Sequence, residues 1–160
     1  MYCIFVLLLL TIKLYNLKKM KRTAKAQWIG NAKEGKGELT TQSEILNKTN
    51  YSFKTRFTDE EKGTNPEELL AAAHAGCFTM AVSFALTEQG LPPTSLITDA
   101  TLTMEGFHIT GIHLAITGIV PGISAETFSA FVKVAEKDCL ISKALSISIT
   151  SEAHLTFFEN

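Results

Sequence analysis

Cys77 is a candidate nucleophile, because its thiol lies inside a long and otherwise apolar stretch of the chain. A thiol reacts as the thiolate, and apolar surroundings raise its pKa and keep it protonated. If the stretch is helical, Ala73 and His74 lie one turn before Cys77, and Met80 lies one turn after it. A reactive Cys77 therefore needs a cation from elsewhere in the chain.

Two basic side chains bear on this chemistry. His74 precedes Cys77 by three residues, as in a Cys/His dyad, but no third residue that would orient the imidazole is evident. We therefore favour a histidine whose hydrogen bonds are satisfied within the helix interior. Arg56 is one of two arginines among 15 basic residues. The alternation of apolar and polar residues over 51–57 alone favours a strand, with Arg56 and Lys54 on its solvent-exposed face.

A single long helix must position Cys77. Asn65 can cap it, Pro66 suits the first helical position, and Glu68 can complete a capping box. Gly90 is a natural stop, with two prolines shortly after it. From residue 69 to residue 86 the helix is apolar on nearly every face, so we expect it to be buried all round.

Composition excludes several classes of protein. At 160 residues the chain suits one domain, and a formal net charge of −1 gives no reason to expect nucleic-acid binding. Three cysteines form no disulfide framework of a secreted protein and no C-x-x-C motif, and the four histidines are scattered. We predict a cytoplasmic protein without a metal or other cofactor.

The first twenty residues do not match the rest. An apolar run from Ile4 to Leu10 precedes a cluster of basic residues and is far shorter than the roughly 20 residues that span a bilayer. The charge follows the apolar run, which is the reverse of a signal peptide. We interpret residues 1–20 as an extension outside the main domain, residues 21–160. Either Met20 is the true start, or the segment is a weak membrane anchor.

Periodicity predicts the remaining elements. Strands are expected at 27–29, 37–41, 51–57 and 96–104, and again from Phe107 to Val120, with one inserted residue near Gly111 that is typical of a β-bulge. A helix should run from Ser124 to about Lys137, followed by a short turn over 140–144 and a last strand over 145–157. This order predicts an α+β fold with about six strands of antiparallel type around the central helix. One sheet covers one side of that helix, so a partner subunit is the simplest second cover.

From Lys21 to its end, the chain resembles the OsmC/Ohr family of thiol-dependent peroxidases, and within it the OsmC branch. The matching stretches are Ala26–Trp28, Gly35–Gly37, Thr55–Phe57, Gly63–Leu69, Ala72–Ala81 and Pro121–Ile123. The resemblance implies an intertwined homodimer of α+β subunits with both active sites at the interface. It also implies that the protein reduces organic hydroperoxides in oxidative or osmotic stress defence.

The resemblance assigns four site residues. Cys77 corresponds to the peroxidatic thiol, Cys139 to its resolving partner, and Arg56 and Glu67 to the arginine and glutamate of the family. The family usually has C-P-x-S at the second cysteine, whereas Leu140 follows Cys139 here. A proline fixes φ at a helix entry, so its loss puts in question how accurately Cys139 is held.

These assignments fit the chemistry of the residues. A thiolate that attacks an O–O bond becomes a sulfenic acid, which a second thiol converts to a disulfide. Arg56 would supply the missing cation, Glu67 would fix the guanidinium, and the apolar pocket would suit hydroperoxides with organic tails. An external dithiol, of lipoyl type by the resemblance, would reduce the disulfide. Two alternatives stay open: a non-enzymatic, stress-induced dimeric binding module, and a protein thiol-disulfide reductase.

Overall fold

The computed structural model describes residues 19–58 and 61–157. These residues form two compact units, which meet in the sequence between Gly63 and Thr64. The predicted N-terminal extension, residues 1–20, lies outside the described residues apart from its last two, and Cys3 lies outside them as well. Each unit is described by itself below.

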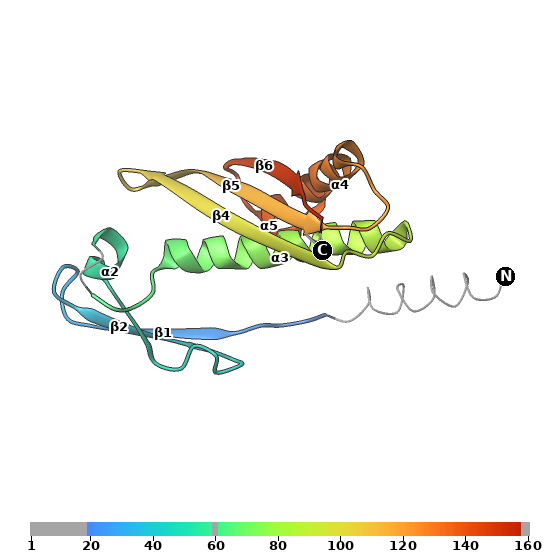
Figure 1. Ribbon diagram of the computed structural model, residues 1–160. Coiled ribbons are helices and arrows are strands. Elements are labelled where there is room, and N and C mark those ends of the chain that lie inside the picture. The colour runs from blue at the N-terminus through green and yellow to red at the C-terminus, as the bar shows by residue number, and fades with distance from the viewer. Residues whose placement is uncertain (1–18, 59–60, 158–160) are drawn as a thin grey trace. The chain divides into compact units, whose positions relative to one another are not determined.

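The first unit is a three-stranded antiparallel sheet followed by a short helix (Figure 1). Its strands are β1 (Ala24–Ile29), β2 (Lys36–Thr41) and β3 (Thr49–Ser52), and they lie in the order β1-β2-β3. The predicted turn between the first two strands is confirmed. Its closing bond runs from the Gly35 amide to the Asn31 carbonyl at 2.8 Å, and Gly30 adopts a φ of 98°.

The strand predicted over 51–57 is wrong after Ser52, because residues Phe53–Phe57 form the helix α2. Ser52 caps this helix: its hydroxyl accepts from the Thr55 amide at 3.1 Å, and its own amide donates to the Thr55 hydroxyl at 2.8 Å. One turn apart, the rings of Phe53 and Phe57 pack with centroids 4.7 Å apart. These local interactions stabilise a helix, although the two-residue alternation of the sequence predicts a strand. Arg56 therefore lies on a helix.

The second unit packs three helices with a mixed sheet (Figure 1). Its strands are β4 (Ser95–Glu105), β5 (His108–Ile119) and β6 (Ser148–Leu155), in the order β4-β5-β6. The α+β class and the six strands are confirmed, and so is the bulge, because Thr110 is skipped in the pairing of β5 with β4. One pairing differs from the expected antiparallel type: β6 runs parallel to β5.

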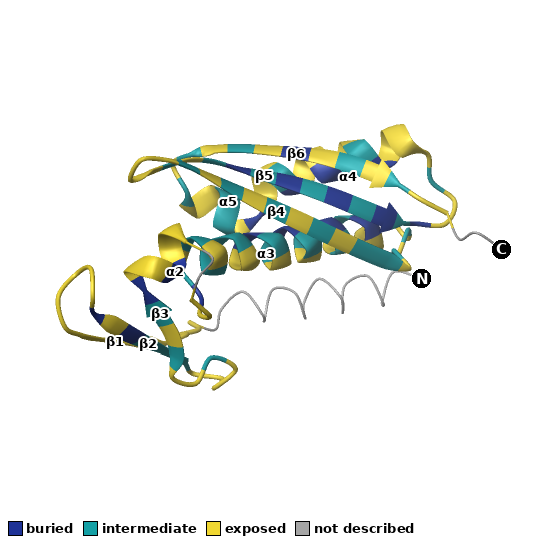
Figure 2. Cartoon of the chain, turned by 60° about the vertical axis from the view of Figure 1, so that its left-hand side comes forward, coloured by how far each residue is buried: buried dark blue, intermediate teal, exposed yellow. Residues whose placement is uncertain are grey.

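The central helix α3 (Pro66–Glu88) begins and ends as predicted. Asn65 caps it by accepting from the Glu68 amide at 2.8 Å, and Gly90 follows it with a φ of 74°. Within the second unit, one face of α3 is buried, the stripe of residues four apart: His74, Phe78, Val82 and Leu86. This unit leaves the other side of α3 largely exposed, as Figure 2 shows, and its cover by a partner subunit stays a prediction.

By length and composition alone, α3 could cross a membrane. Its buried stripe instead packs on the sheet of the same unit, as a core helix does. The Thr79 hydroxyl on α3, for example, donates to that of Thr98 on β4 at 2.7 Å.

The helix α4 (Ala125–Asp138) packs beside α3 and over β6. It begins after Ser124, where the sequence predicts a helix to start, and Ser124 caps it; Phe128, Val132 and Ala135 bury its apolar stripe in the core. In its second half, Lys133 donates to the Ser151 carbonyl on β6 at 2.8 Å. This bond links α4 to the sheet ahead of Cys139.

We predict that Gly118→Ala destabilises the second unit by about 1–3 kcal/mol, the usual result of overpacking a core. A Cβ on Gly118 would lie 2.5 Å from Cζ of the buried Phe128 and 3.0 Å from Cδ2 of Leu96. Urea unfolding followed by circular dichroism measures the effect. An unfolding free energy equal to that of the wild type would contradict the packing described for α4.

Candidate active site

Two free thiols from distant parts of the second unit meet side by side. Cys77 lies in the middle of α3 and Cys139 follows α4, yet their Sγ atoms are 2.9 Å apart. Cys139 is 1% exposed, whereas Cys77 is partly exposed. The structure therefore brings together the two cysteines that the sequence analysis singled out. At this distance a disulfide, about 2.05 Å long, requires only a small movement.

Cys139 lies at the junction of two helices. Its amide donates to the Ala135 carbonyl at 2.9 Å and ends α4, while its carbonyl accepts from the Lys143 amide at 3.0 Å and begins α5 (Leu140–Ala144). The turn predicted over these five residues is thus helical. Cys139 occupies the N-cap position of α5, where a side chain can accept from amides that have no partner within the helix.

The first turn of α5 affects the ionisation of both sulfur atoms. The amides of Ile141 and Leu140 act to lower the pKa of Cys77, and the Ser142 amide, the Ser142 hydroxyl and the Ile141 amide act to lower the pKa of Cys139. The amide of Leu140 is notable, because a proline at that position has no N–H to donate. The departure from C-P-x-S therefore adds one donor beside Cys77.

The two thiols differ in how readily they ionise. Burial, and next the contact with Cys139, raise the pKa of the Cys77 thiol and outweigh the two amides that lower it. Burial also acts to raise the pKa of Cys139, but the bonds from Cys77 and from the start of α5 outweigh it and lower that pKa. Within the second unit, the amides that act on Cys77 thus do not offset the effect of its burial on the pKa.

His74 is fully buried below Cys77 on α3. Its Nε2 lies 2.9 Å from the Ser142 hydroxyl, whereas its Nδ1 has no hydrogen-bond partner among the described residues. Burial lowers the pKa of His74, so the ring is neutral near pH 7. The interpretation as a satisfied interior histidine is therefore right for one ring nitrogen only.

Comparison with known proteins agrees with the matched motifs. Residues 58–153 match the family described as OsmC-like protein. Over 138 residues the chain is 45% identical to peroxiredoxin OsmC of Escherichia coli strain K12, covering 84% of this chain and 96% of that protein. The chain belongs to the OsmC family.

Other members of the OsmC family share its sequence or its fold. The chain is 37% identical over 99 residues to the organic hydroperoxide resistance protein OhrA of Bacillus subtilis strain 168, which covers 58% of this chain and 68% of OhrA. The crystal structure of OhrB of Bacillus subtilis superposes with a TM-score of 0.61 at 25% identity, covering 84% of this chain and 98% of OhrB. An OsmC-like protein of Vibrio cholerae has the same fold, with a TM-score of 0.68 at 15% identity, over 84% of this chain and 99% of that chain.

The other two predicted site residues are Glu67 and Arg56. Neither is a neighbour of Cys77 within the second unit. Glu67 is in the first turn of α3, ten residues before Cys77, which is about 15 Å along a straight helix axis. Arg56 belongs to the first unit, where it is exposed on α2 with its Cζ 5.4 Å from the centre of the Phe57 ring.

No metal centre is found within residues 19–58 and 61–157, because no three His, Cys, Asp or Glu side chains there gather closely enough to hold an ion.

The sequence analysis gave no role to Ser142 or to the start of α5. One signal was available: Cys139 and Ser142 are three residues apart at the end of an amphipathic helix, the spacing of an N-cap and the third helical position. Contact between Ser142 and His74 could not have been found from spacing, because the two residues are 68 positions apart.

We predict that Leu140→Pro raises the pKa of the Cys77 thiol, because it removes an amide that acts to lower this pKa. Cys139 has a φ of −55° and a ψ of 128°, which suits a residue before proline, and Leu140 is at the first helical position, where proline fits. The rate of alkylation by iodoacetamide against pH reports this pKa, in a Cys3→Ser/Cys139→Ser background that leaves one thiol.

Leu140→Ala is the matched control, because it shortens the same exposed side chain and keeps the amide. It should alkylate with the midpoint of the parent. Equal midpoints for the proline and alanine variants would contradict the role of this amide.

Proposed function

We propose that this protein is a thiol-based peroxidase that reduces organic hydroperoxides, with Cys77 as the peroxidatic thiol and Cys139 as the resolving thiol. The observation that carries the proposal is the approach of two free thiols, 62 residues apart in sequence, to 2.9 Å. Two relatives support it by their names, a peroxiredoxin and an organic hydroperoxide resistance protein. This pairing of thiols serves a cycle of oxidation and resolution.

The cycle has three steps. The Cys77 thiolate attacks one oxygen of the hydroperoxide; an S–O bond forms, the O–O bond breaks, and the alkoxide leaves as the alcohol after taking a proton. Cys139 then attacks the sulfur of this sulfenic acid, which gives a Cys77–Cys139 disulfide and water. An external dithiol reduces the disulfide by exchange, and we propose one of lipoyl type.

Arg56 and Glu67 complete the proposed site. Because the pKa of Cys77 is raised by burial, a thiolate there needs a positive charge, and a guanidinium is charged at all working pH values. Arg56 would favour the thiolate and donate to the departing alkoxide. Glu67 would hold the planar guanidinium through a bidentate pair.

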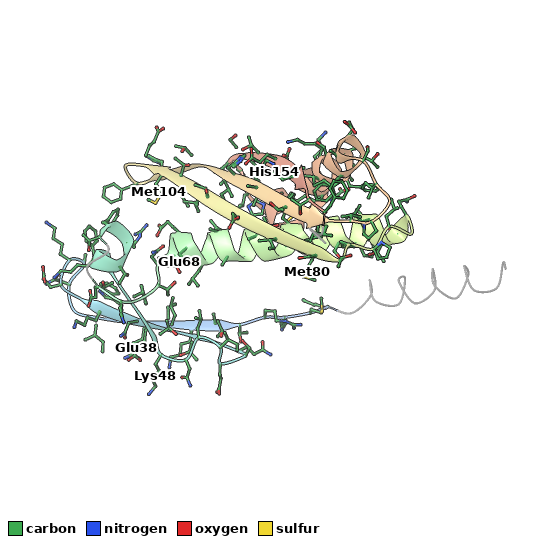
Figure 3. All side chains as sticks on the ribbon, in the orientation of Figure 1. Glu38, Lys48, Glu68, Met80, Met104 and His154 are labelled. Atoms are coloured by element: carbon green, nitrogen blue, oxygen red, sulfur yellow. The ribbon has the colours of Figure 1, made fainter. Side chains whose placement is uncertain are left out.

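A second copy of the chain is the proposed cover for the exposed face of α3. This face carries Met80, 73% exposed and labelled in Figure 3, and Phe84, 57% exposed. Ala72, Ala73 and Gly76 are exposed nearby, and a Cβ added at Gly76 would meet no atom within 4 Å beyond its chain neighbours and the backbone of its own helix. Small residues let two helices approach closely. An antiparallel pair of α3 helices would therefore bury this exposed face.

The dimer is also what would bring Glu67 to a thiol. If two α3 helices cross antiparallel at about Ala72, midway between Glu67 and Cys77, the glutamate of one subunit lies beside the Cys77 of the other. The exposed apolar face of α3, with Met80 and Phe84, would then line the entrance for the organic tail of the hydroperoxide. We propose that residues 21–160 act as this one peroxidase domain in the cytoplasm.

We predict that Cys77→Ser abolishes peroxide reduction, because the other described thiol, Cys139, is almost completely buried and not accessible to a hydroperoxide. Cys139→Ser should consume one equivalent of peroxide and then stop at the sulfenic acid or a higher oxidation state of Cys77. Cumene hydroperoxide consumption with a lipoyl-type dithiol measures both variants. Wild-type turnover by Cys77→Ser would contradict the peroxidase assignment.

We predict that two inactive variants, Glu67→Ala and Cys77→Ser, complement each other in mixed dimers. Each mixed dimer would contain one site in which both residues are intact, so activity should return to about half that of the wild type. Co-expression with two affinity tags isolates the mixed dimers for the peroxidase assay. Mixed dimers that form but remain inactive would show that Glu67 serves the thiol of its own chain.

A further inference from the structure

We propose that the external dithiol attacks the Cys77–Cys139 disulfide at the sulfur of Cys77, so that Cys139 is always the leaving thiol and never meets a molecule from solvent. The inference rests on the proposed peroxidase function and concerns its third step, the reduction of the disulfide. It makes Cys77 the one place at which both the hydroperoxide and the reductant react.

The two sulfur atoms differ in how far solvent can reach them. Cys139 is 1% exposed and belongs to the buried core cluster of the second unit, whereas Cys77 is partly exposed and packs against that cluster. The thiolate of a reductant must touch the sulfur that it attacks, so access decides between the two ends of a disulfide. Within the second unit, Cys77 gives that access and Cys139 does not.

Cys77 lies at the boundary between the exposed and the buried faces of α3. At about 100° per residue, Gly76 and Met80 lie to one side of Cys77 on the helix, and both are exposed. Phe78 lies to the other side and is fully buried. The Cys77 sulfur therefore has an open side, toward Met80, and a closed side, where the buried Cys139 sulfur lies 2.9 Å away.

The chain around Cys139 is held in place by hydrogen bonds on both sides of it. Its amide donates to the Ala135 carbonyl at 2.9 Å, and its carbonyl accepts from the Lys143 amide at 3.0 Å. On α3, the fully buried His74 places its Nε2 2.9 Å from the Ser142 hydroxyl on α5. These bonds tie α5 to its neighbours, so a reductant would have to displace this helix to reach the Cys139 sulfur.

Displacement at a divalent sulfur is in line, because the attacking atom enters opposite the bond that breaks. In the first step, the hydroperoxide reaches Cys77 from the open side, so the new S–O bond points to that side. The sulfenic acid is then attacked in line from the closed side, where Cys139 lies. Once the disulfide has formed, its S–S bond points to the closed side, and the next attack on Cys77 comes from the open side.

The two sides of Cys77 thus serve alternate steps. A dithiol on the open side is in line with the disulfide but not with the S–O bond of the sulfenic acid, which is the reason why Cys139→Ser should stop after one oxidation. In-line attack on the other end of the disulfide would have to start on the far side of Cys139, a sulfur that is almost completely buried.

The reduction exchanges one disulfide for another. One thiolate of the dithiol bonds to the Cys77 sulfur, the bond from Cys77 to Cys139 breaks, and Cys139 leaves as a thiolate that takes up a proton. The second thiolate of the dithiol attacks its own first sulfur, closes a cyclic disulfide and releases Cys77. The dithiol loses two electrons and the protein disulfide gains them.

The ionisation of Cys139 also favours its departure. Burial acts to raise the pKa of Cys139, but the contact with Cys77 and the first turn of α5 outweigh burial and lower that pKa. A thiol of lower pKa leaves a disulfide faster. Access and leaving ability therefore select the same direction of attack.

The test captures the mixed disulfide that forms first. In a Cys3→Ser background, diamide oxidises Cys77 and Cys139 to the disulfide without any peroxide. The probe is dihydrolipoamide with one thiol methylated, which can attack the disulfide but cannot close its own ring. Samples are quenched in acid over time and capped with N-ethylmaleimide in acidic urea. Mass spectrometry of the peptides then shows which cysteine carries the probe and which carries the maleimide.

We expect the probe on Cys77 and the maleimide on Cys139, with at least about tenfold less of the reverse pattern at the earliest times. The same oxidised protein unfolded in urea is the matched control. There both sulfur atoms are accessible, so the probe should be divided about evenly between the two cysteines.

A probe found mainly on Cys139, or divided in the folded protein as it is in urea, would overturn the inference and leave the proposed function standing. If diamide forms the disulfide but cumene hydroperoxide does not, the proposed function is wrong, whereas a probe trapped on Cys77 still shows that this sulfur is the one open to attack. If neither oxidant joins Cys77 to Cys139, both the proposed function and the inference are overturned.

Discussion

The burial of a sulfur that must become charged is the constraint on which the rest of this structure depends. Cys77 lies on a helix whose neighbouring residues are mostly small or apolar, and burial raises its pKa. Mid-helix placement also keeps it about three turns from the helix N-terminus, whose dipole lowers a thiol pKa. Every donor to this thiolate must therefore come from another segment. The start of α5 supplies two amides, and the proposed site adds Arg56.

The two thiols need opposite surroundings, and the fold provides them with one short helix. Cys139 stands at the N-cap position of α5, and the first turn of that helix together with Cys77 lowers its pKa although it is almost completely buried. For Cys77 the amides of the same turn do not offset burial, and its pKa is raised. This asymmetry explains why the first step of the proposed cycle requires a cation.

Local sequence signals predicted the parts of the fold that local interactions determine. The cap at Asn65, the stop at Gly90 and the bulge near Gly111 are all confirmed, because each depends on neighbouring residues. Seven alternating residues could not distinguish a strand from the capped helix α2. Spacing also could not show that His74 meets Ser142 or that β6 runs parallel to β5, since both depend on how distant segments pack. Pairing of Cys77 with Cys139 came from family resemblance, and the structure brings the two together.

The central claim, that ionisation of Cys77 depends on a cation from outside its own helix, is tested most directly by the pH dependence of its alkylation with and without Arg56. In a Cys3→Ser/Cys139→Ser background, Arg56→Ala should shift the midpoint of iodoacetamide alkylation to higher pH. Arg56→Lys should restore it only in part, because an ammonium lacks the forked geometry of a guanidinium. The same midpoint with arginine and with alanine at position 56 would contradict the account.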